Sequence, residues 1–417
     1  MEYSIKRRNQ CRLCHQNSLT KILHFENIPF FTDVVTKEFR GKEFSYPLKI
    51  YFCNDCASVQ TQYDFDITDY YQKYQYIASQ SKFVVNYMKE LVQYCKDTLK
   101  LKAGDKVVEI GCSDGYLLQL FQEIGANVLG FEAAENLCAL AKNRGVNVVN
   151  TLFEKRTLNL IPKDFDQIQL LVLLHTFDHL YDPVPFIQAA KDLLCPKSGV
   201  LLLEVHDLED IYNKKEAAVL GHEHAIYLHF DSMERFLHEN GFRIIDFNFL
   251  DKAMIRESSM LVAATPIGSD VQKFSDLSSF SSKKLDQLET FQSFQKDVEA
   301  SFGRLRSYIE DGIKIGRKFV SYGGGPRGVS TLAMAKLDKS HLSFVSDGNV
   351  NLQGCYVPVS GFEIRSPMDI NRSEADEVIV TNYSYIEEIE STLQGFINQG
   401  GKVISVLDIL SGTLDEH

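Results

Sequence analysis

The sequence has neither a long apolar run nor a cluster of basic residues. No stretch approaches the ~18 consecutive apolar residues that cross a bilayer, so we expect no membrane span. No Lys/Arg run is longer than three residues, and 44 basic against 56 acidic residues give a formal net charge of −12. Since a nucleic-acid backbone is bound by clustered Lys and Arg, this composition argues against nucleic acid as a partner.

The N-terminus also lacks the apolar core of a secretory signal peptide, because Met1 to Gln10 are largely polar. We therefore expect a cytoplasmic protein, in a reducing compartment that favours metal over disulfides for paired cysteines. Four of the nine cysteines form two tight pairs near the start of the chain. The scattered cysteines are Cys95, Cys112, Cys138, Cys195 and Cys355.

The chain of 417 residues is too long for one ordinary core, and two or three domains are expected. Hydrophobic residues make up 44% and charged residues 24%, as in ordinary soluble proteins. We predict a cysteine-containing domain at 1–65, an α/β domain with a helical lead-in at 66–265, and a second α/β domain at 266–417. Residues 268–290 are rich in Ser and Asp and resemble a surface linker that runs into a helix.

Strands and helices alternate from residue 104 onward, which predicts parallel sheets whose faces are covered by helices. Helical spacing of apolar residues also predicts a helix around 83–92. The other expected helices are 116–124, 134–143 and 184–194. The expected strands are 106–111, 127–131, 169–174, 200–205, 319–322, 344–346, 377–381 and 402–406.

The two cysteine pairs, Cys11-x2-Cys14 and Cys53-x2-Cys56, are separated by 38 residues. Each turn aims two thiolates at one point, and two such turns complete a tetrahedral zinc site with no open position, so the role is structural. The metal would hold together a segment that has little core of its own. The letters CRLCH also match a c-type haem attachment pattern, and four ordinary thiols are the other alternative. His15 is expected to be a bystander.

A glycine loop follows the strand predicted at 106–111, with the form E-x-G-x-x-x-G before a helix. Glycines permit a sharp turn and close approach to a ligand, and the helix N-terminus supplies amide donors. The spacing differs from the G-x-G-x-x-G of dinucleotide binders and suits a smaller ligand such as the methionine part of S-adenosylmethionine. The candidate cofactor-binding residues are Glu109, Gly111, Asp114 and Gly115.

The next strand ends in Glu132, whose carboxylate can accept both hydroxyls of a ribose. The loop and this acid together predict an adenosyl ligand. The alternative is a tight turn in a generic α/β domain, with Glu132 solvated.

Residues 221–230 contain three histidines, a Glu and a Tyr, and they follow a strand whose carboxyl end should face the ligand crevice. Histidine suits proton abstraction because its pKa lies near neutrality. A metal site is a second interpretation, because His222 and His224 would share one face if the segment were a strand. Structural packing is a third.

Over nearly its whole length the chain resembles the sugar C-methyltransferase family, which makes C-methylated deoxysugars. The resemblance runs through the CxxC…CxxC region, EIGCSDG, GVLLLEV and HEH, and then through SYGGGPRGVSTLA, SDGNVNLQGCYVPVSGFEIRSP and NYSYIEEI. It implies an α/β protein with a small zinc-binding N-terminal domain, a Rossmann-like class I methyltransferase domain and a second Rossmann-like C-terminal domain. The implied cofactors are S-adenosylmethionine and a structural Zn²⁺.

The resemblance also implies a mechanism on a thymidine-diphosphate 4-keto-6-deoxysugar. A base removes the proton on C3, the enolate is stabilised by nearby donors, and its carbon attacks the sulfonium methyl. His224 matches the base and Glu223 its neighbour, while Tyr76 and His179 match further active-site residues. Tyr76 could instead cover a domain junction, and His179 could cap a helix.

The C-terminal glycine loop after strand 319–322 could hold a phosphate through its amides. Arg327 could pair with a diphosphate, and we assign Gly324, Arg327 and Asp347 to substrate binding. A Rossmann unit kept for packing is the alternative.

Four positions depart from the family pattern and leave the sugar and the position of its ketone open. His222 and Tyr227 are assigned to substrate binding as candidates to replace the hydrogen bond of a missing tyrosine. The departures are Ala133 for Pro, His175 for Asn, Gly221 for Tyr, and Thr381 for a frequent Trp in a chain without tryptophan.

We therefore expect an enzyme that C-methylates a nucleotide-linked keto-deoxysugar, as a monomer or small homo-oligomer. O- or N-methylation of a sugar nucleotide is the first alternative. A non-catalytic nucleotide-sugar-binding homologue is the second.

Overall fold

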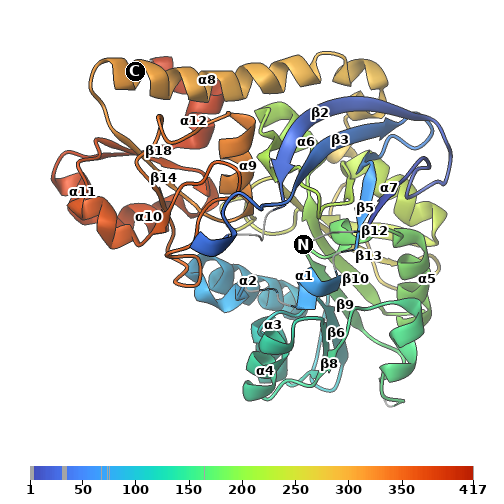
Figure 1. Cartoon of the computed structure of the whole chain (residues 1–417). Coiled ribbons are helices and arrows are strands. Elements are labelled where there is room, and N and C mark those ends of the chain that lie inside the picture. Colours follow the sequence, from blue (N-terminus) through green and yellow to red (C-terminus); the bar gives the residue numbers. More distant parts are fainter. Residues whose placement is uncertain are drawn as a thin grey trace.

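The chain folds around four sheets, of seven, five, four and two strands, in the part described by the computed structural model. Figure 1 shows the seven-stranded sheet in teal, green and yellow, the five-stranded unit in orange and red, and the N-terminal strands in blue. Every helix in this part is too short or too polar to cross a membrane. The described residues are 4–30, 35–66, 68–72, 74, 76–163 and 165–416.

The seven-stranded sheet has the order β12-β13-β10-β9-β6-β7-β8, and β13 alone runs antiparallel to the other six strands. The order reverses between β6 and β9, which opens a crevice at the carboxyl ends of the parallel strands. The strands are β6 (Lys106–Ile110), β7 (Asn127–Glu132), β8 (Val148–Asn150), β9 (Leu170–Leu174), β10 (Val200–His206), β12 (Phe242–Phe247) and β13 (Ser259–Pro266).

Helices cover both faces of this sheet, because its central strands are almost entirely apolar and buried. Helix α2 buries Val84, Tyr87 and Leu91, at the helical spacing that predicted it. The helices are α1 (Thr68–Gln72), α2 (Lys82–Asp97), α3 (Tyr116–Glu123), α4 (Glu135–Asn143), α5 (Pro183–Leu193), α6 (Leu208–Lys214) and α7 (Phe230–Glu239).

The N-terminal sheet includes a strand from far along the chain. Its order is β11-β4-β3-β2, and β11 pairs Ile226 with Gln60 and Tyr227 with Val59. The histidine-rich segment is therefore attached to the cysteine-containing region. The strands are β2 (Leu19–Pro29), β3 (Ser45–Cys53), β4 (Val59–Thr61) and β11 (Ile226–Tyr227), with β1 (Ile5–Arg7) and β5 (Tyr63–Phe65) paired beside them.

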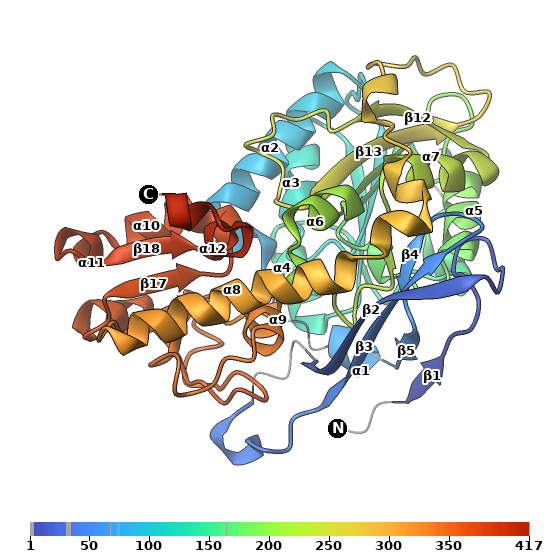
Figure 2. The ribbon, with the colours of Figure 1, turned by 90° about the horizontal axis from the view of Figure 1, so that it is seen from above.

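The C-terminal unit is a five-stranded parallel sheet of order β16-β15-β14-β17-β18, so the prediction of a second α/β unit is confirmed. Its long helix α8 extends from this unit to the N-terminal sheet (Figure 2), where Gln295 accepts a hydrogen bond from the His24 amide at 2.7 Å. The elements are α8 (Phe294–Lys314), β14 (Phe319–Tyr322), α9 (Pro326–Met334), β15 (Val345–Ser346), β16 (Ile364–Arg365), β17 (Glu377–Val380), α10 (Ile386–Thr392), α11 (Gln394–Asn398), β18 (Lys402–Ser405) and α12 (Val406–Ser411).

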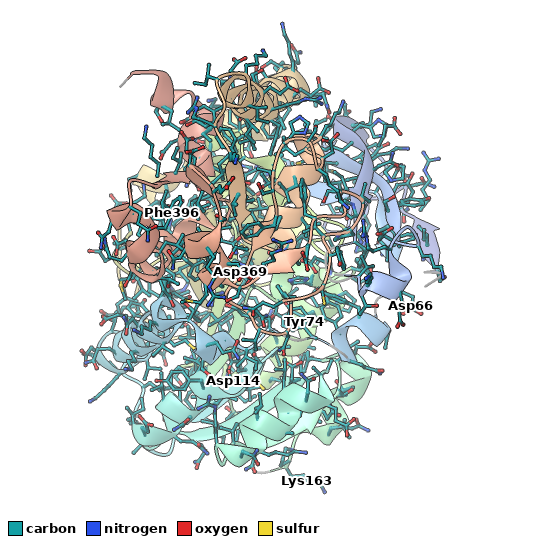
Figure 3. All side chains as sticks on the ribbon, turned by 60° about the vertical axis from the view of Figure 1, so that its left-hand side comes forward. Asp66, Tyr74, Asp114, Lys163, Asp369 and Phe396 are labelled. Atoms are coloured by element: carbon teal, nitrogen blue, oxygen red, sulfur yellow. The ribbon has the colours of Figure 1, made fainter. Side chains whose placement is uncertain are left out.

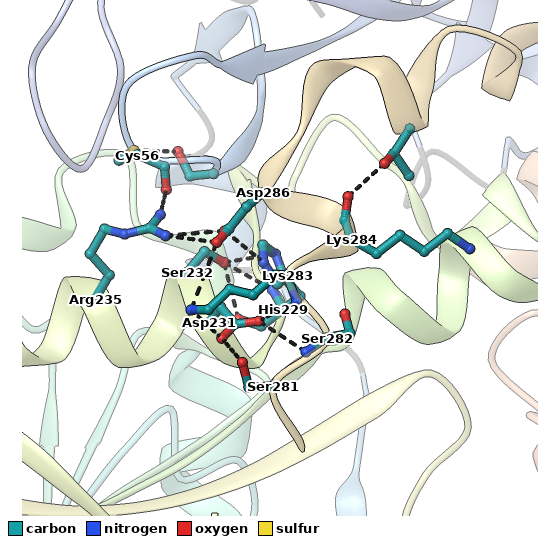
Figure 4. Close-up of polar contacts among 12 residues, drawn as sticks. Cys56, His229, Asp231, Ser232, Arg235, Ser281, Ser282, Lys283, Lys284 and Asp286 are labelled. Carbon is teal, nitrogen blue, oxygen red and sulfur yellow. Dashed lines mark hydrogen bonds and ion pairs between the residues drawn. The ribbon is translucent and has the colours of Figure 1, made fainter. Parts of the chain in front are cut away.

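The predicted linker lies largely on the surface but is held by two carboxylates (Figure 4). Asp231 of α7 accepts hydrogen bonds from the hydroxyl of Ser281 at 2.6 Å and from the ammonium of Lys283 at 2.8 Å. Asp286 accepts from Arg235 at 3.1 Å, and Arg235 also donates to the carbonyl of Cys56 at 2.5 Å. The linker, α7 and the cysteine region thus form one polar network.

Candidate active site

The four paired cysteines converge on one point. The Sγ atoms of Cys11 and Cys56 are 3.5 Å apart, those of Cys14 and Cys53 are 3.6 Å apart, and all four lie within 4.8 Å of one another. Four thiolates around zinc would be about 3.8 Å apart, given Zn–S bonds of about 2.3 Å. The residues therefore fit a structural zinc ion. A c-type haem would need Cys11 and Cys14 as a pair of their own, but these two cysteines lie in one cluster with Cys53 and Cys56. Burial raises the pKa of the Cys14 thiol to about 12, and a bound cation would oppose that shift.

The residue between the first two cysteines connects this cluster to the histidine-rich segment. The Arg12 side chain is completely buried, and its guanidinium pairs with Asp64 at 2.6 Å. The same group donates to the carbonyls of Thr61 at 3.1 Å and Tyr181 at 3.2 Å. The Thr61 amide in turn donates to the Ala225 carbonyl at 3.0 Å. The position of Ala225 and its neighbours thus depends on the cysteine-containing region.

The glycine loop after β6 requires glycine for two reasons. Gly111 and Gly115 both have a φ of 74°, a left-handed conformation that favours glycine. A Cβ at Gly111 would lie 2.5 Å from the Thr176 hydroxyl, and one at Gly115 would lie 2.7 Å from the Ala141 side chain. The first contact also places the segment after β9 directly against the loop.

Three buried carboxylates surround this loop. Glu132 accepts the Ser113 and Ala134 amides, each at 2.9 Å. One carboxylate oxygen of Glu109 and one of Asp114 are buried without a hydrogen-bond partner. Burial, and then the charges of Asp114 and Glu132, raise the pKa of Glu109 well above its usual range. Arg144 pairs with Asp114 at 2.7 Å. Among the described residues no Lys or Arg pairs with Glu109 or Glu132, so these two carboxylates favour a cationic ligand, and the ammonium and sulfonium groups of S-adenosylmethionine fit them.

The tyrosine-rich segment lies along the same loop. Ser79 donates to Asp114 at 2.5 Å, and the Ser113 hydroxyl donates to the Tyr76 carbonyl at 3.1 Å. The Tyr74 ring is 6.5 Å from the Tyr76 ring, and Figure 3 labels Tyr74 and Asp114 near each other in the lower half of the view. Tyr76 is 43% exposed, and the hydrogen bond that its carbonyl accepts from Ser113 places this predicted catalytic residue beside the glycine loop.

Four histidine rings form a chain at the carboxyl ends of β9 and β10. The His224 ring lies 4.7 Å from His179 and 4.3 Å from His206, whose ring is 4.8 Å from His175. His224 donates a hydrogen bond from Nδ1 to the Val219 carbonyl at 2.9 Å. Because a carbonyl only accepts, Nε2 is left as the basic nitrogen of the neutral ring.

Tyrosines from helix α1 support the predicted catalytic pair. Tyr70 donates to one oxygen of Glu223 at 2.7 Å, and the other oxygen lies 3.7 Å from His224 Nε2. The Tyr71 hydroxyl hydrogen-bonds His179 Nδ1 at 2.8 Å. Burial, and then the neighbouring His224, lower the pKa of His179, so this ring is neutral at neutral pH.

His206 and Asp178 belong to the cluster and were not among the site residues predicted from the sequence. Asp178 accepts from His206 Nδ1 at 2.5 Å, and its carbonyl accepts the Ala225 amide at 2.7 Å. Burial and His224 lower the pKa of His206 to about 3. The position of His206 at the end of β10 is the sequence feature that could have identified it.

His222 and Tyr227 have backbone partners. His222 is buried, stacks on Phe30 at 5.6 Å, and its Nε2 hydrogen-bonds the Ile28 carbonyl at 3.1 Å. The Tyr227 hydroxyl accepts the Gly221 amide at 2.9 Å. Residues 221–225 are not a strand, so the idea that His222 and His224 share one face as a metal site is wrong. The two side chains hold the loop that carries His224.

The residues assigned to substrate binding in the C-terminal unit lie in two places. The Gly324 amide donates to Asp347 at 2.7 Å, so this amide already has an anionic partner. Arg327 lies over the Tyr383 ring at 4.7 Å, and Tyr383 donates to Glu216 at 3.3 Å. Glu216 immediately precedes the turn that contains Val219. Arg327 therefore adjoins the segment that holds His224.

Known proteins resemble most of the chain. Family models described as "Putative zinc binding domain", "Methyltransferase domain" and "C-methyltransferase C-terminal domain" match residues 11–71, 80–246 and 264–407. C-methyltransferase NovU from Streptomyces niveus is 25% identical over 401 residues, which cover 95% of this chain and 94% of that protein. A ubiquinone biosynthesis O-methyltransferase from Coxiella burnetii (strain Dugway 5J108-111) is 22% identical over 167 residues, 37% of this chain and 70% of that protein.

Among solved structures, magnesium protoporphyrin IX methyltransferase from Synechocystis PCC 6803 aligns with a TM-score of 0.35 and 16% identity, covering 47% of this chain and 90% of that chain.

Proposed function

Because this chain belongs to the S-adenosylmethionine-dependent methyltransferases that combine a zinc-binding domain, a methyltransferase domain and a C-methyltransferase C-terminal domain, we propose that it methylates a carbon atom of a nucleotide-linked keto-deoxysugar. In this proposal His224 is the base. The methylated carbon lies next to the ketone, where a proton is acidic enough to be removed.

The observation that carries the proposal is the hydrogen bond from His224 Nδ1 to the Val219 carbonyl. It leaves Nε2 free to accept a proton, and this nitrogen lies 3.7 Å from a Glu223 oxygen. A histidine held in this tautomer beside a carboxylate is suited to accept the proton of a carbon acid. The choice of carbon over oxygen or nitrogen is supported by the match to the C-methyltransferase C-terminal domain model and by the similarity to C-methyltransferase NovU.

The residues divide the reaction between them. S-adenosylmethionine supplies an electrophilic methyl group from the site lined by Glu109, Asp114 and Glu132. His224 takes the α-proton, and the C–H electron pair moves toward the ketone oxygen to form an enolate. The enolate carbon then bonds to the methyl group as the S–CH₃ bond breaks, which leaves S-adenosylhomocysteine. Glu223 stabilises the imidazolium that forms on His224.

The ketone oxygen needs hydrogen-bond donors while its negative charge develops. The Tyr71–His179 pair is suited to this role, because the His179 ring lies 4.7 Å from His224. Its neutral imidazole can donate to substrate from the nitrogen that does not bond Tyr71. Tyr76, on the cofactor side, is assigned to positioning the sugar near the methyl group.

The nucleotide is assigned to the surface between the methyltransferase and C-terminal units. Arg327 is the residue of the C-terminal glycine loop suited to a diphosphate, since a guanidinium can bind two phosphate oxygens at once. Its present partners are the Tyr383 ring and the nearby charge of Glu216. Gly324 and Asp347 shape the turn that presents Arg327.

Two measurements test this proposal. Purified protein is incubated with nucleotide 4-keto- and 3-keto-sugars and S-adenosylmethionine, and the expected product is heavier by one methyl group. In deuterium oxide without S-adenosylmethionine, the wild type is expected to exchange the proton next to the ketone. A methylated product formed from a substrate without such a proton would instead identify O- or N-methylation. Binding of both ligands without turnover would identify a non-catalytic homologue.

A further inference from the structure

Besides the four cysteines, a second cluster of side chains that can bind a metal ion lies beside the proposed base His224. The proposed reaction gives this cluster no joint role. His175, Asp178 and His206 each offer one ligand atom, and these three atoms lie within 4.8 Å of one another. His175 directly follows β9, and His206 ends β10. The cluster therefore occupies the carboxyl ends of two adjacent parallel strands, where ligands bind in sheets of this type.

Two atoms of this cluster are buried and have no hydrogen-bond partner. They are Nδ1 of His175 and Oδ1 of Asp178, whose residue is only 1% exposed. The other Asp178 oxygen accepts from His206 Nδ1 at 2.5 Å, which orients that ring. Buried polar atoms without partners are rare, and such an atom indicates a partner of another kind, such as an ion.

The buried carboxylates near this cluster have too few cationic partners. Asp178, Glu204 and Glu223 are all at most 4% exposed. Arg256 pairs with Glu204 at 3.4 Å. Across the described part of the chain, no Lys or Arg forms an ion pair with the other two carboxylates. Buried charges are normally paired or bound to metal, so a divalent cation would balance these two.

We propose that His175, Asp178 and His206 bind one divalent transition-metal ion, separate from the zinc held by the four cysteines. Two imidazoles and one carboxylate suit metals such as Fe²⁺, Co²⁺, Ni²⁺ and Zn²⁺. Three protein ligands leave coordination positions open for a substrate, in contrast to the closed cysteine site.

The location of the site gives the ion a role that rests on the proposed function. The His206 ring lies 4.3 Å from the ring of the base His224. A cation there would polarise the ketone oxygen as a Lewis acid. The α-proton passes to His224 while the electron pair moves to that oxygen, where the cation neutralises the charge. No oxidation or reduction is involved.

Metal binding can be measured without substrate. The full-length protein, with its cysteine site saturated with zinc, is dialysed against Co²⁺ and analysed for bound metal. The wild type is expected to hold one ion per chain beyond the zinc. Asp178→Asn, His206→Gln and His175→Asn are each expected to lose most of that second ion. The matched control is His238→Gln, an exposed histidine on α7, which is expected to retain it.

Binding of S-adenosylmethionine by each variant shows that it is folded. The absorption spectrum of the bound Co²⁺ is a second readout, because nitrogen and oxygen ligands give a spectrum different from that of thiolates. A folded wild type that takes up no ion beyond the cysteine zinc overturns the proposal. So does a second ion that all three variants retain. Failure of methyl transfer with the ion bound would count against the proposed reaction and leave the metal site standing.

Discussion

The two halves of the candidate active site are built in different ways. The glycine-loop half consists of residues 109–115 and Glu132, at the ends of the adjacent strands β6 and β7. The histidine half draws its side chains from separate segments that meet only in the folded chain. The residues of the histidine half are His175, Asp178, His179, His206, Glu223 and His224.

The halves also depend on different supports. The glycine loop depends on its own backbone and on close contacts with Thr176 and Ala141. The histidine half depends on the N-terminal sheet, because β11 pairs with β4 next to the cysteine cluster. The comparison therefore leads us to expect that the zinc-binding region supports the histidine half, where we propose that the proton is removed, and that cofactor binding depends little on it. Four perturbations test this separation.

The largest expected effect is on turnover in His224→Ala. Loss of a positioned general base typically lowers the rate by about 10²–10⁴-fold, and we expect a fall of that size in methyl transfer. S-adenosylmethionine affinity should stay within about twofold of the wild type, because the cofactor binds on the glycine-loop half. Turnover and calorimetric cofactor binding are measured together, with the exposed His238→Ala as the control. Near-normal turnover in His224→Ala would exclude this residue as the base.

Removing a zinc ligand should affect the histidine half next most strongly. In Cys53→Ser we expect β4 and β11 to loosen, and a misplacement of the base by about 1 Å can cost about 10²-fold in rate. Hydrogen exchange at Ile226 and Tyr227 should become faster, while cofactor binding is largely retained. Cys355→Ser, a cysteine outside the cluster, is the control. Equal losses of cofactor binding and turnover in Cys53→Ser would contradict the separation.

His222 should make the histidine half sensitive to acid. Burial lowers its pKa to about 4 from the usual 6.5, so between these values the unfolded chain binds a proton that the folded chain does not. The stability associated with neutral His222 is complete above pH 6.5 and falls as the pH drops toward 4. From pH 7 to pH 5 the loss is about 2 kcal/mol.

His222→Gln removes this titration. The free energy of unfolding of the wild type should therefore decrease more steeply with acid than that of the variant, as urea titrations at pH 5, 6 and 7 can measure. Parallel pH profiles for the two proteins would show that His222 does not titrate in this way.

The smallest expected effect is on cofactor affinity in Gly115→Ala. The left-handed backbone and a Cβ only 2.7 Å from the Ala141 side chain strain this position. A cost of about 1.4 kcal/mol corresponds to a tenfold weaker Kd for S-adenosylmethionine. Deuterium exchange of the keto-sugar without cofactor should be unchanged. Gly145→Ala is the control, because Gly145 has a φ of 80° but an added Cβ meets no atom within 4 Å. If the two variants lost the same affinity for S-adenosylmethionine, the left-handed backbone would explain the loss, and the contact with Ala141 would not contribute.

The buried parallel strands were predictable because each is a short apolar run, as in β6, β9 and β17. The irregular strand β2 was missed, since it shifts register twice against β3 and its burial does not alternate regularly. The edge strand β12 and the antiparallel strand β13 beside it were missed too. A buried run such as Ser259–Pro266 does not by itself show where it joins the sheet.

The site was predictable to a different extent in its two halves. Glu109, Asp114 and Glu132 were expected near a ligand, and the structure brings all three to the loop. His222 and His224 are only two residues apart, yet one bonds the Ile28 carbonyl and the other the Val219 carbonyl. Nothing in the local sequence distinguishes these partners.

The sequence by itself determined the elements whose geometry is local: two cysteine turns that each aim two thiols at one point, and a glycine turn that only glycine can adopt at the end of a strand. The tertiary structure alone decided which histidines meet. In an irregular loop the direction of a side chain is set by hydrogen bonds and packing from distant segments. For this reason His206 and Asp178, 28 residues apart in the chain, became partners only when β9 and β10 paired.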